Sequence, residues 1–478
     1  MLRRVAYVHS DALTQAADRL PSNPGRASLV HALIAALDLV ATDESSSRSH
    51  GHEPRATVVQ PREATCEELL RFHDSRYVGT LLGTDSDSSD ASSEDDAGSS
   101  SPSSPRRTFG LSSDSADPPR KRKKIDTLGL QDDCPVFDGL PDYVKLVAGA
   151  SMTAARELRD GRADVAINWT GGRHHGKRGE AAGYCYVNDI VLAIMELRSS
   201  PQQCPAPSLP SSPATQPCTP TPAPPLPPRI SRVLYLDWDL HHGDGVESAF
   251  LASPYVMTLS VHLHAPLFYP LTGALDSTGP PDRMAKGAHH ALNVPLEPGT
   301  GEETLRRVWD TCIEPIRQAY GPDAIVLQLG TDGLAGDPCK EWNLPLSAMG
   351  YALERVLGWQ LRTLLLGGGG YHSANAARAW AYLTSVALAR PLALDTPIPP
   401  DLPSSMYARF GPDWTLDVPE LYGVRDRNTD ETLRRVEGAF RGYEGHVRER
   451  WVGKGKVKSE RPDTGRAETA LEAEERLS

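Results

Sequence analysis

Apolar residues form two kinds of pattern along the chain. One places apolar residues three or four positions apart, which is typical of helices. It occurs in residues 28–40, 141–160, 188–200, 301–320 and 347–360. The other is a short continuous apolar run, typical of buried strands, and it occurs in residues 164–169, 232–236, 324–330 and 363–366. Because strands alternate with helices, the pattern predicts an α/β protein with a mainly parallel sheet that helices cover on both faces.

Three segments depart from this pattern. Residues 84–128 open with a serine-rich acidic stretch, residues 199–228 are rich in proline, and residues 446–478 form a charged tail. Such segments cannot bury enough apolar surface to offset the entropy lost on ordering, so we expect all three to be disordered. Residues 1–445, apart from the two insertions, are then expected to form a single domain.

A basic run lies near the end of the first insertion. Residues 120–124 read RKRKK, five consecutive basic residues, and this run resembles a nuclear localisation signal. The alternative is a solvated run that balances the nearby acidic residues. We favour the signal, and we expect the protein in the nucleus, with the cytoplasm as a further location.

Charge and composition exclude several classes of protein. The chain has 478 residues and a formal net charge of −12 at pH 7, which argues against direct sequence-specific binding of nucleic acid. No apolar run approaches the roughly 20 residues of a bilayer-spanning helix, so we expect no membrane insertion. The start, MLRRVAYVHS, has too short an apolar segment for a secretory signal and predicts a strand. The seven cysteines include no C-x-x-C pair, which argues against a disulfide framework and a structural zinc cluster.

Each of the four predicted strands leads into polar or glycine-rich sequence. The segments that follow them contain TGGRHHGKRGEAAGYCYVND, DWDLHHGDGV, TDGLAGD and GGGGYH. In sheets of this kind, ligands bind at the carboxyl ends of the strands. We therefore expect these four segments to meet at one edge of the sheet and to form the functional site.

Three candidate metal ligands follow the second of these strands. Asp237, Asp239 and His241 stand at alternate positions, so in an extended chain they point to one face. Trp238 and Leu240 then point to the other face. Carboxylate oxygen and imidazole nitrogen suit Zn²⁺, Mn²⁺ or Fe²⁺, and a catalytic zinc takes three protein ligands.

A ligand could also come from a neighbouring strand. If only Asp239 and His241 reach the ion, Asp332 in LQLGTDG is positioned to complete the set. Because the motif is short, there is an alternative without a metal: the acidic residues that follow the strand could simply accept hydrogen bonds from the backbone.

Two further motifs offer groups for proton transfer and charge stabilisation. Buried beside a metal, His174 and His175 could act as general base and acid, because imidazole titrates near neutral pH. Asp237 and Asp244 are candidates to orient the two rings. In GGGGYH, the glycines allow a close backbone approach, and Tyr371 offers a phenol to an oxyanion. The alternatives are a surface histidine pair and a phosphate-binding loop, although no Lys-Ser/Thr follows the glycines.

Four segments in this order resemble the zinc-dependent histone deacetylases of class I: TGGRHHGKRGEAAGYCYVND, YLDWDLHHGDGVESAF, VLQLGTDGLAGDP and LLLGGGGYHSANAARAW. PGRASLVHALI near the start and FGPDWTLDV near the end resemble the same family. The resemblance spans about Arg4 to Phe440 apart from the two insertions. It implies a single arginase-like, three-layer α/β/α domain that hydrolyses acetyl-lysine.

The resemblance also implies two metal sites. Zn²⁺ would be held by Asp239, His241 and Asp332, with Fe²⁺ as an alternative ion, and a water on the metal would attack the acetyl carbonyl. A structural K⁺ would lie near Asp237 and Ser260.

The matching motifs carry over the remaining catalytic roles. His174 and His175, backed by Asp237 and Asp244, would transfer protons, with His175 favoured as general base and acid. Tyr371 would stabilise the tetrahedral oxyanion together with the metal.

By the same resemblance, four residues would bind the substrate. Gly183, Tyr184 and Tyr269 would line a narrow tunnel for the acetyl-lysine side chain. Asp133 would hold the substrate backbone at the rim of that tunnel.

The chain departs from the family at several positions. Arg173 precedes the histidine pair where the family often has an aromatic residue, and Tyr184 stands where phenylalanine is usual. Thr331 and Gly333 flank the expected aspartate ligand, a change that should be tolerated. Pro338 replaces an arginine that helps complex-forming members to bind an inositol phosphate at a corepressor interface. Its presence favours the lone-acting branch of the class.

The expected substrates are acetylated proteins such as histone tails, and corepressor proteins are expected partners. Two alternatives are a deacetylase of acetylpolyamines or other small amides, and a non-catalytic chromatin scaffold. A third is a cysteine hydrolase that uses Cys185, but no feature of the sequence favours it over a neutral thiol.

Overall fold

The computed structural model describes residues 3–41, 53–84, 128–202, 225–282 and 284–452. Most of both insertions and most of the tail therefore lie outside the described residues, which include residues 199–202, 225–228 and 446–452 of these segments. The basic run lies outside them entirely, so the predictions made for the residues that are not described stay predictions.

Within the described residues, nine strands form one sheet in the order β2-β3-β1-β4-β9-β8-β5-β6-β7. All neighbouring strands run parallel. The strands are β1 (Val5–Val8), β2 (Val40–Ala41), β3 (Ala56–Val59), β4 (Val165–Asn168), β5 (Val233–Asp237), β6 (Val256–Leu263), β7 (Ala291–Leu296), β8 (Ala324–Gln328) and β9 (Arg362–Leu366). The predicted parallel sheet is confirmed.

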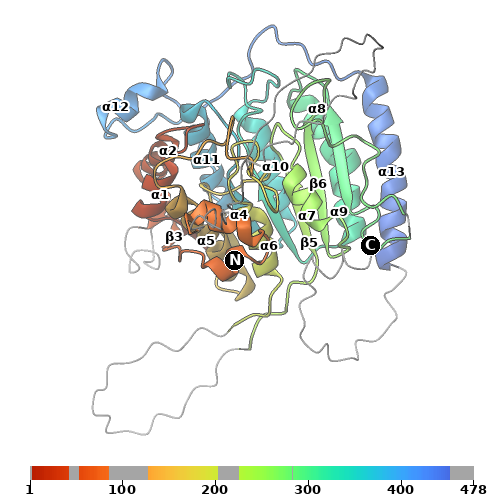
Figure 1. Ribbon diagram of the computed structural model, residues 1–478. Helices are drawn as coiled ribbons and strands as arrows, with labels where there is room; N and C mark the ends of the chain where they lie inside the picture. Colours follow the sequence, from red (N-terminus) through yellow and green to blue (C-terminus); the bar gives the residue numbers. More distant parts are fainter. Residues whose placement is uncertain (1–2, 42–52, 85–127, 203–224, 283, 453–478) are drawn as a thin grey trace, which may run out of the picture.

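Helices cover both faces of the sheet (Figure 1). One layer contains α1 (Asp11–Ala17), α3 (Cys66–Leu69), α4 (Ser75–Leu82), α5 (Leu140–Arg159), α6 (Asp189–Leu197) and α7 (Asp244–Phe250). The other contains α2 (Arg26–Ala36), α8 (Glu302–Val308), the π-helical η2 (Trp309–Ile313), α9 (Glu314–Tyr320), α10 (Leu346–Gly358), α11 (Ser373–Ala387), α12 (Ser404–Tyr407), the short η3 (Ala408–Phe410) and α13 (Asp430–Val452). None of the helices in the described ranges is long and apolar enough to cross a membrane.

The strands are apolar on both sides because each face of the sheet meets a helix layer. In β5, Val233 and Tyr235 pack in the core beneath one layer, whereas Leu234 and Leu236 pack in the core beneath the other. Alternate residues of a strand point to opposite faces, so a fully covered parallel sheet needs a continuous apolar run. The expected three-layer α/β/α domain is confirmed.

Four neighbouring strands place their last residues in one row. Asn168 of β4 pairs with Leu366 of β9, which pairs with Gln328 of β8, which in turn pairs with Asp237 of β5. Since the strands are parallel, the polar segments that follow them all leave the sheet at the same edge. This common edge is the arrangement expected from the four strand ends.

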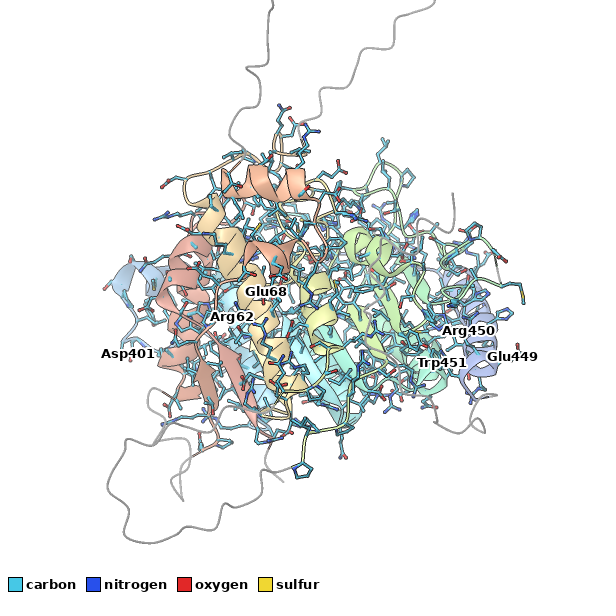
Figure 2. The ribbon with its side chains drawn as sticks, turned by 60° about the horizontal axis from the view of Figure 1, so that its bottom comes forward. Arg62, Glu68, Asp401, Glu449, Arg450 and Trp451 are labelled. Carbon is cyan, nitrogen blue, oxygen red and sulfur yellow. The ribbon has the colours of Figure 1, made fainter. Side chains whose placement is uncertain are left out.

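The last helix extends the domain beyond the predicted boundary. Residues 446–452, which the sequence assigned to a disordered tail, continue α13, and Val447 is fully buried. Trp451 donates from its indole nitrogen to Nε2 of His290 at 3.0 Å, and Figure 2 labels it beside Arg450 on this helix. The charged composition concealed these contacts, because a single apolar stripe is enough to dock an otherwise polar helix.

Candidate functional site

Two carboxylates hold the histidine pair that follows β4. His174 Nδ1 lies 2.9 Å from Asp237 Oδ2, at the end of β5. His175 Nδ1 lies 2.8 Å from Asp244 Oδ1, at the start of α7. Both histidines are buried, and their ring centroids are 4.0 Å apart. The structure thus brings together all four residues that the sequence proposed for proton transfer.

The two histidines have different protonation behaviour. Burial lowers the pKa of His174, but the charges of Asp237 and Asp239 outweigh this effect and raise it to about 9. Burial and the charge of His174 lower the pKa of His175 to about 3, despite its hydrogen bond to Asp244. The pair therefore combines one cationic ring with one neutral ring near neutral pH.

Asp239, His241 and Asp332 meet at one point beyond the ends of β5 and β8. His241 Nδ1 lies 3.0 Å from Asp332 Oδ2 and 3.3 Å from Asp239 Oδ1. The other oxygen of Asp239 accepts hydrogen bonds from Gln328 Nε2 at 2.8 Å and from the backbone of Gly369 at 2.9 Å. These contacts orient Asp239, so that its Oδ1 faces His241.

The chain between Asp237 and His241 differs in one respect from the expectation. β5 ends at Asp237, and the chain bends over residues 239–241, so the assumed extended conformation up to His241 is wrong. Trp238 and Leu240 nevertheless pack in the apolar core. The two aspartates therefore have different partners. Asp237 contacts His174, whereas Asp239 faces His241.

The charges of this cluster fit a divalent cation. Burial and the charge of Asp239 raise the pKa of Asp332 to about 7. Burial lowers the pKa of His241, but its hydrogen bonds to both carboxylates raise it to about 10. The protons on His241 and Asp332 thus offset the negative charge of the two buried carboxylates, Asp239 and Asp332. A divalent cation bound at the same point would offset this charge instead. Two carboxylates and one imidazole are a donor set that suits Zn²⁺ or Fe²⁺.

A thiol offers a second set of metal ligands at the same point. Ligand atoms of His241, Asp332 and Cys339 lie within 4.8 Å of one another. Burial and the charges of Asp332 and Asp337 raise the pKa of Cys339, which favours a neutral thiol over a thiolate ligand. The set with Asp239 is favoured, because its atoms already face His241 at hydrogen-bonding distance.

The glycine run after β9 allows the backbone to lie directly against the carboxylates of Asp239 and Asp332. A Cβ atom on Gly369 would lie 2.3 Å from Asp332 Oδ2, and Gly370 has a φ of +122° that only glycine adopts readily. The backbone of Tyr371 is held by Asp337 Oδ2 at 2.7 Å. Burial raises the pKa of Tyr371 well above its ordinary value, so its phenol stays protonated and can donate a hydrogen bond.

The expected substrate-binding residues lie around the opening of the site. Asp133 Oδ2 accepts a hydrogen bond from the backbone of Gly183 at 2.8 Å, and a Cβ atom on Gly183 would lie 2.3 Å from the ring of His175. Tyr269 meets His175 edge to face at 4.9 Å. Tyr184 and Tyr269 are partly exposed, so the two aromatic rings lie between the histidine pair and solvent.

One pocket contains the histidine pair and two of the three expected metal ligands, whereas Asp133, Tyr269 and Asp332 are not among its lining residues. It is lined by Ser22, Asn23, Gly172, Arg173, His174, His175, Gly183, Tyr184, Cys185, Asp239, His241, Gly368, Gly369 and Tyr371. Burial raises the pKa of the Cys185 thiol to about 12. A thiol that stays protonated is a poor nucleophile, so the cysteine-hydrolase alternative loses its chemical basis.

Sequence reasoning missed several polar groups that support the site. Gln328 donates to Asp239 and Tyr235 donates to Asp237 at 2.6 Å, while Lys177 pairs with Asp244. A signal existed for Gln328, since it is the one amide in an apolar strand. For the thiol of Cys339 no signal existed, because its approach depends on how the loop after β8 folds.

Comparisons with known proteins agree with this geometry. A family model described as a histone deacetylase domain matches residues 20–204 and 227–387. Histone deacetylase 8 of Danio rerio is 36% identical over 442 residues, covering 92% of this chain and 95% of that protein. Histone deacetylase 8 of Xenopus tropicalis is 34% identical, covering 91% and 96%. Histone deacetylase 1 of Homo sapiens is 33% identical over 390 residues, covering 81% and 66%.

Proposed function

Because the chain belongs to the class I histone deacetylases, we propose that it is a zinc-dependent hydrolase that removes acetyl groups from lysine side chains of proteins, histone tails among them. One observation carries the proposal. The carboxylates of Asp239 and Asp332 both approach His241 Nδ1, and a histidine pair backed by two carboxylates lines the same pocket as Asp239 and His241. Metal-assisted amide hydrolysis needs this combination of groups.

In the proposed mechanism, Asp239, His241 and Asp332 hold the metal. When bound there, Zn²⁺ supplies a Lewis acid that polarises a carbonyl and brings the pKa of water to about 7. Gln328 and the backbone of Gly369 restrain Asp239, so the ligands are positioned before a metal arrives. The acyl-lysine enters past Tyr184 and Tyr269.

The histidine pair transfers the protons. His175 contacts the rim residues Gly183 and Tyr269, whereas the Nε2 atom of His174 lies 3.7 Å from Asp239. His175 is therefore the member that faces the substrate, and we assign it as the base that accepts the proton of water and returns it to the lysine amine. His174 lies between the carboxylates of Asp237 and Asp239, which favour its charged form, and in that form it would stabilise negative charge nearby.

Tyr371 stabilises the oxyanion. Its phenol lines the pocket beside the metal ligands, and its backbone is fixed by Asp337 at the end of the glycine run. A prepositioned donor in a buried site lowers the barrier because charge develops on the carbonyl oxygen only in the transition state.

Two further parts of the proposal rest on the family alone. The structural K⁺ would lie near Asp237 and Ser260, which pair in register on β5 and β6. A lone-acting enzyme is favoured over a corepressor subunit, because Pro338 occupies an exposed position where complex-forming members have arginine.

The substrate class is tested by comparing two amides. The zinc-loaded full chain is expected to hydrolyse an acetyl-lysine histone peptide with a higher kcat/KM than an acetylated polyamine, since the rim residue Asp133 can accept backbone hydrogen bonds of a peptide. A preference for the polyamine would favour the small-amide alternative. Turnover of neither substrate, with metal bound, would favour a non-catalytic scaffold.

Substitution of Asp239 tests the metal ligands. Asp239→Ala is expected to lose most of the bound zinc together with activity, because it removes one of three ligands. Cys339→Ala is the matched control and is expected to keep the zinc. Metal content per chain, measured by mass spectrometry after dialysis, distinguishes the two ligand sets, and the reverse result would assign the thiol as a ligand instead.

Substitution of Tyr371 tests the oxyanion role. Tyr371→Phe removes only the phenol oxygen, so we expect unchanged zinc content and a kcat lower by about 10²-fold or more. A variant with full kcat would show that another group stabilises the oxyanion.

We propose that the protein enters the nucleus through Arg120–Lys124, although this run lies outside the described residues. Replacing the five basic residues with alanine in a fluorescent fusion of the full chain is expected to lower nuclear accumulation. Unchanged accumulation would indicate import by another route.

A further inference from the structure

The edge of the sheet at which the strands begin, opposite the catalytic edge, carries a group of arginines. Arg232 immediately precedes β5 and Tyr255 immediately precedes β6, and these two strands begin in register. Arg198 follows α6, and Trp451 lies near the end of α13 (Figure 2). With Arg229, these residues form what we call the basic-aromatic patch: Arg198, Arg229, Arg232, Tyr255 and Trp451.

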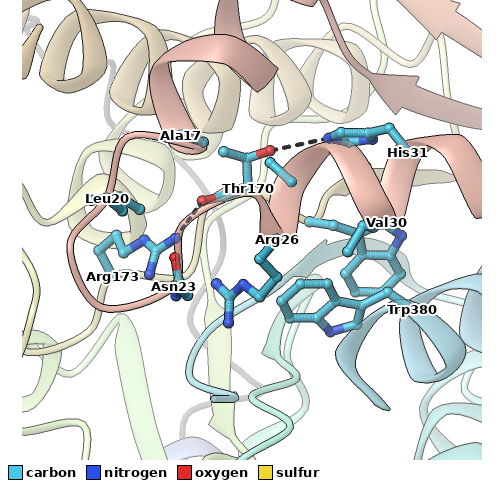
Figure 3. Close-up of a pocket in the computed structure, with 11 residues that line it drawn as sticks. Ala17, Leu20, Asn23, Arg26, Val30, His31, Thr170, Arg173 and Trp380 are labelled. Carbon is cyan, nitrogen blue, oxygen red and sulfur yellow. Dashed lines mark hydrogen bonds between the residues drawn. The ribbon is translucent and has the colours of Figure 1, made fainter. Parts of the chain in front are cut away.

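The accessibility of these arginines distinguishes them from those at the catalytic edge. Arg26 and Arg173 are buried, and both donate hydrogen bonds to backbone carbonyls of the domain (Figure 3). In the basic-aromatic patch, by contrast, Arg229 is exposed, and Arg198 and Arg232 are half-buried. The arginines of the patch are therefore accessible to another molecule.

Aromatic rings orient two of the guanidinium groups of the patch. The guanidinium of Arg198 lies 5.4 Å from the ring centroid of Tyr255. The guanidinium of Arg232 lies 5.0 Å from the ring centroid of Trp451, and the two aromatic rings are 6.0 Å apart. Such stacking restricts the arginine rotamers before a ligand arrives, so binding costs less conformational entropy.

The arginines of the patch also retain unused hydrogen-bond donors. Nε of Arg198 donates to the carbonyl of Ser231 at 3.1 Å, and Nε of Arg229 donates to the carbonyl of Arg198 at 3.0 Å. Within the part of the chain that the structure describes, the terminal nitrogens of these two arginines have no protein partner. Free guanidinium nitrogens suit carboxylates, because two N–H donors match two oxygens.

The positive charge of the patch is largely uncompensated. Among the described residues, no carboxylate forms an ion pair with any of its three arginines. Asp323 adjoins the patch and offsets part of the charge, but its Oδ2 accepts hydrogen bonds from the backbone nitrogens of Ser231 and Arg232. Burial and the nearby charge of Arg229 lower the pKa of Arg198. A bound anion would offset this repulsion.

The adjoining sequence does not supply the missing negative charge. Residues 199–228, which connect Arg198 to Arg229, contain neither Asp nor Glu. Residues 453–458, which follow α13, read GKGKVK and add positive charge. The chain as a whole has a formal net charge of −12, which disfavours a long polyanion such as nucleic acid. A short acidic segment fits this combination of a local positive and an overall negative charge.

We propose that the basic-aromatic patch docks a short acidic segment of a partner protein. Its carboxylates pair with Arg198 and Arg229, and an apolar side chain packs on Tyr255, which is 44% exposed. Arginine, tyrosine and tryptophan are the residue types that contribute most to binding in protein interfaces. Because the patch and the catalytic pocket lie at opposite edges of the sheet, the partner and a substrate can bind together.

A short fluorescein-labelled peptide of repeated Glu-Glu-Leu is the probe for this surface. The full chain is expected to bind it in fluorescence anisotropy measurements. It is expected to bind the matching Gln-Gln-Leu peptide roughly tenfold more weakly or worse, because charge-assisted hydrogen bonds are lost. Added salt should weaken binding of the acidic peptide, since the patch is at the surface.

Substitutions in the patch test where the acidic peptide binds. Arg198→Gln combined with Arg229→Gln is expected to weaken binding roughly tenfold or more, because both charges are removed. Arg435→Gln, on the exposed side of α13, is the matched control and should leave binding unchanged. Circular dichroism establishes that each variant is folded. Should the double variant not fold, Arg229→Glu alone, at an exposed position, gives the same test.

Four results would overturn the proposal. They are equal binding of the two peptides, unchanged binding in the double variant, tighter binding of duplex DNA than of the acidic peptide, and peptide binding only after residues 459–478 are removed. The last result would assign the patch to the chain's own tail. Binding is measured without an acetylated substrate, so a failure to hydrolyse acetyl-lysine would contradict the proposed function alone.

Discussion

The parallel register of β4, β9, β8 and β5 is the constraint on which the site depends. These neighbours end in a single row, so the segments that follow them leave one edge of the sheet together. Residues from four distant parts of the sequence therefore meet without any one loop having to hold them. Each strand is buried on both faces, which fixes its register and hence the position of the side chain at its end.

The same geometry buries three carboxylates at one edge of the sheet, and their charge would be unfavourable there without hydrogen-bond partners. Asp237, Asp239 and Asp332 are all essentially buried. Each has a defined partner: His174 for the first, and His241 with backbone and amide donors for the other two. The cluster is preorganised for a cation. The unfavourable free energy of burying its carboxylates is offset by apolar packing on both faces of the sheet.

Much of this could be predicted from the sequence, because the signals were local. Apolar runs followed by polar segments predicted the sheet, the three layers and the common edge. The residues that were missed act across the fold: Gln328 reaches Asp239 from the next strand, and Cys339 approaches His241 through a folded loop. The docking of residues 446–452 was concealed because Val447 and Trp451 stand among charged residues.

X-ray absorption spectroscopy at the zinc edge of the metal-loaded full chain tests the central claim most directly. If Asp239, His241 and Asp332 hold the ion, the spectrum will show one ordered site with only nitrogen and oxygen neighbours, at roughly 2.0–2.2 Å. A sulfur neighbour at about 2.3 Å, or a zinc ion without an ordered protein shell, would contradict the account.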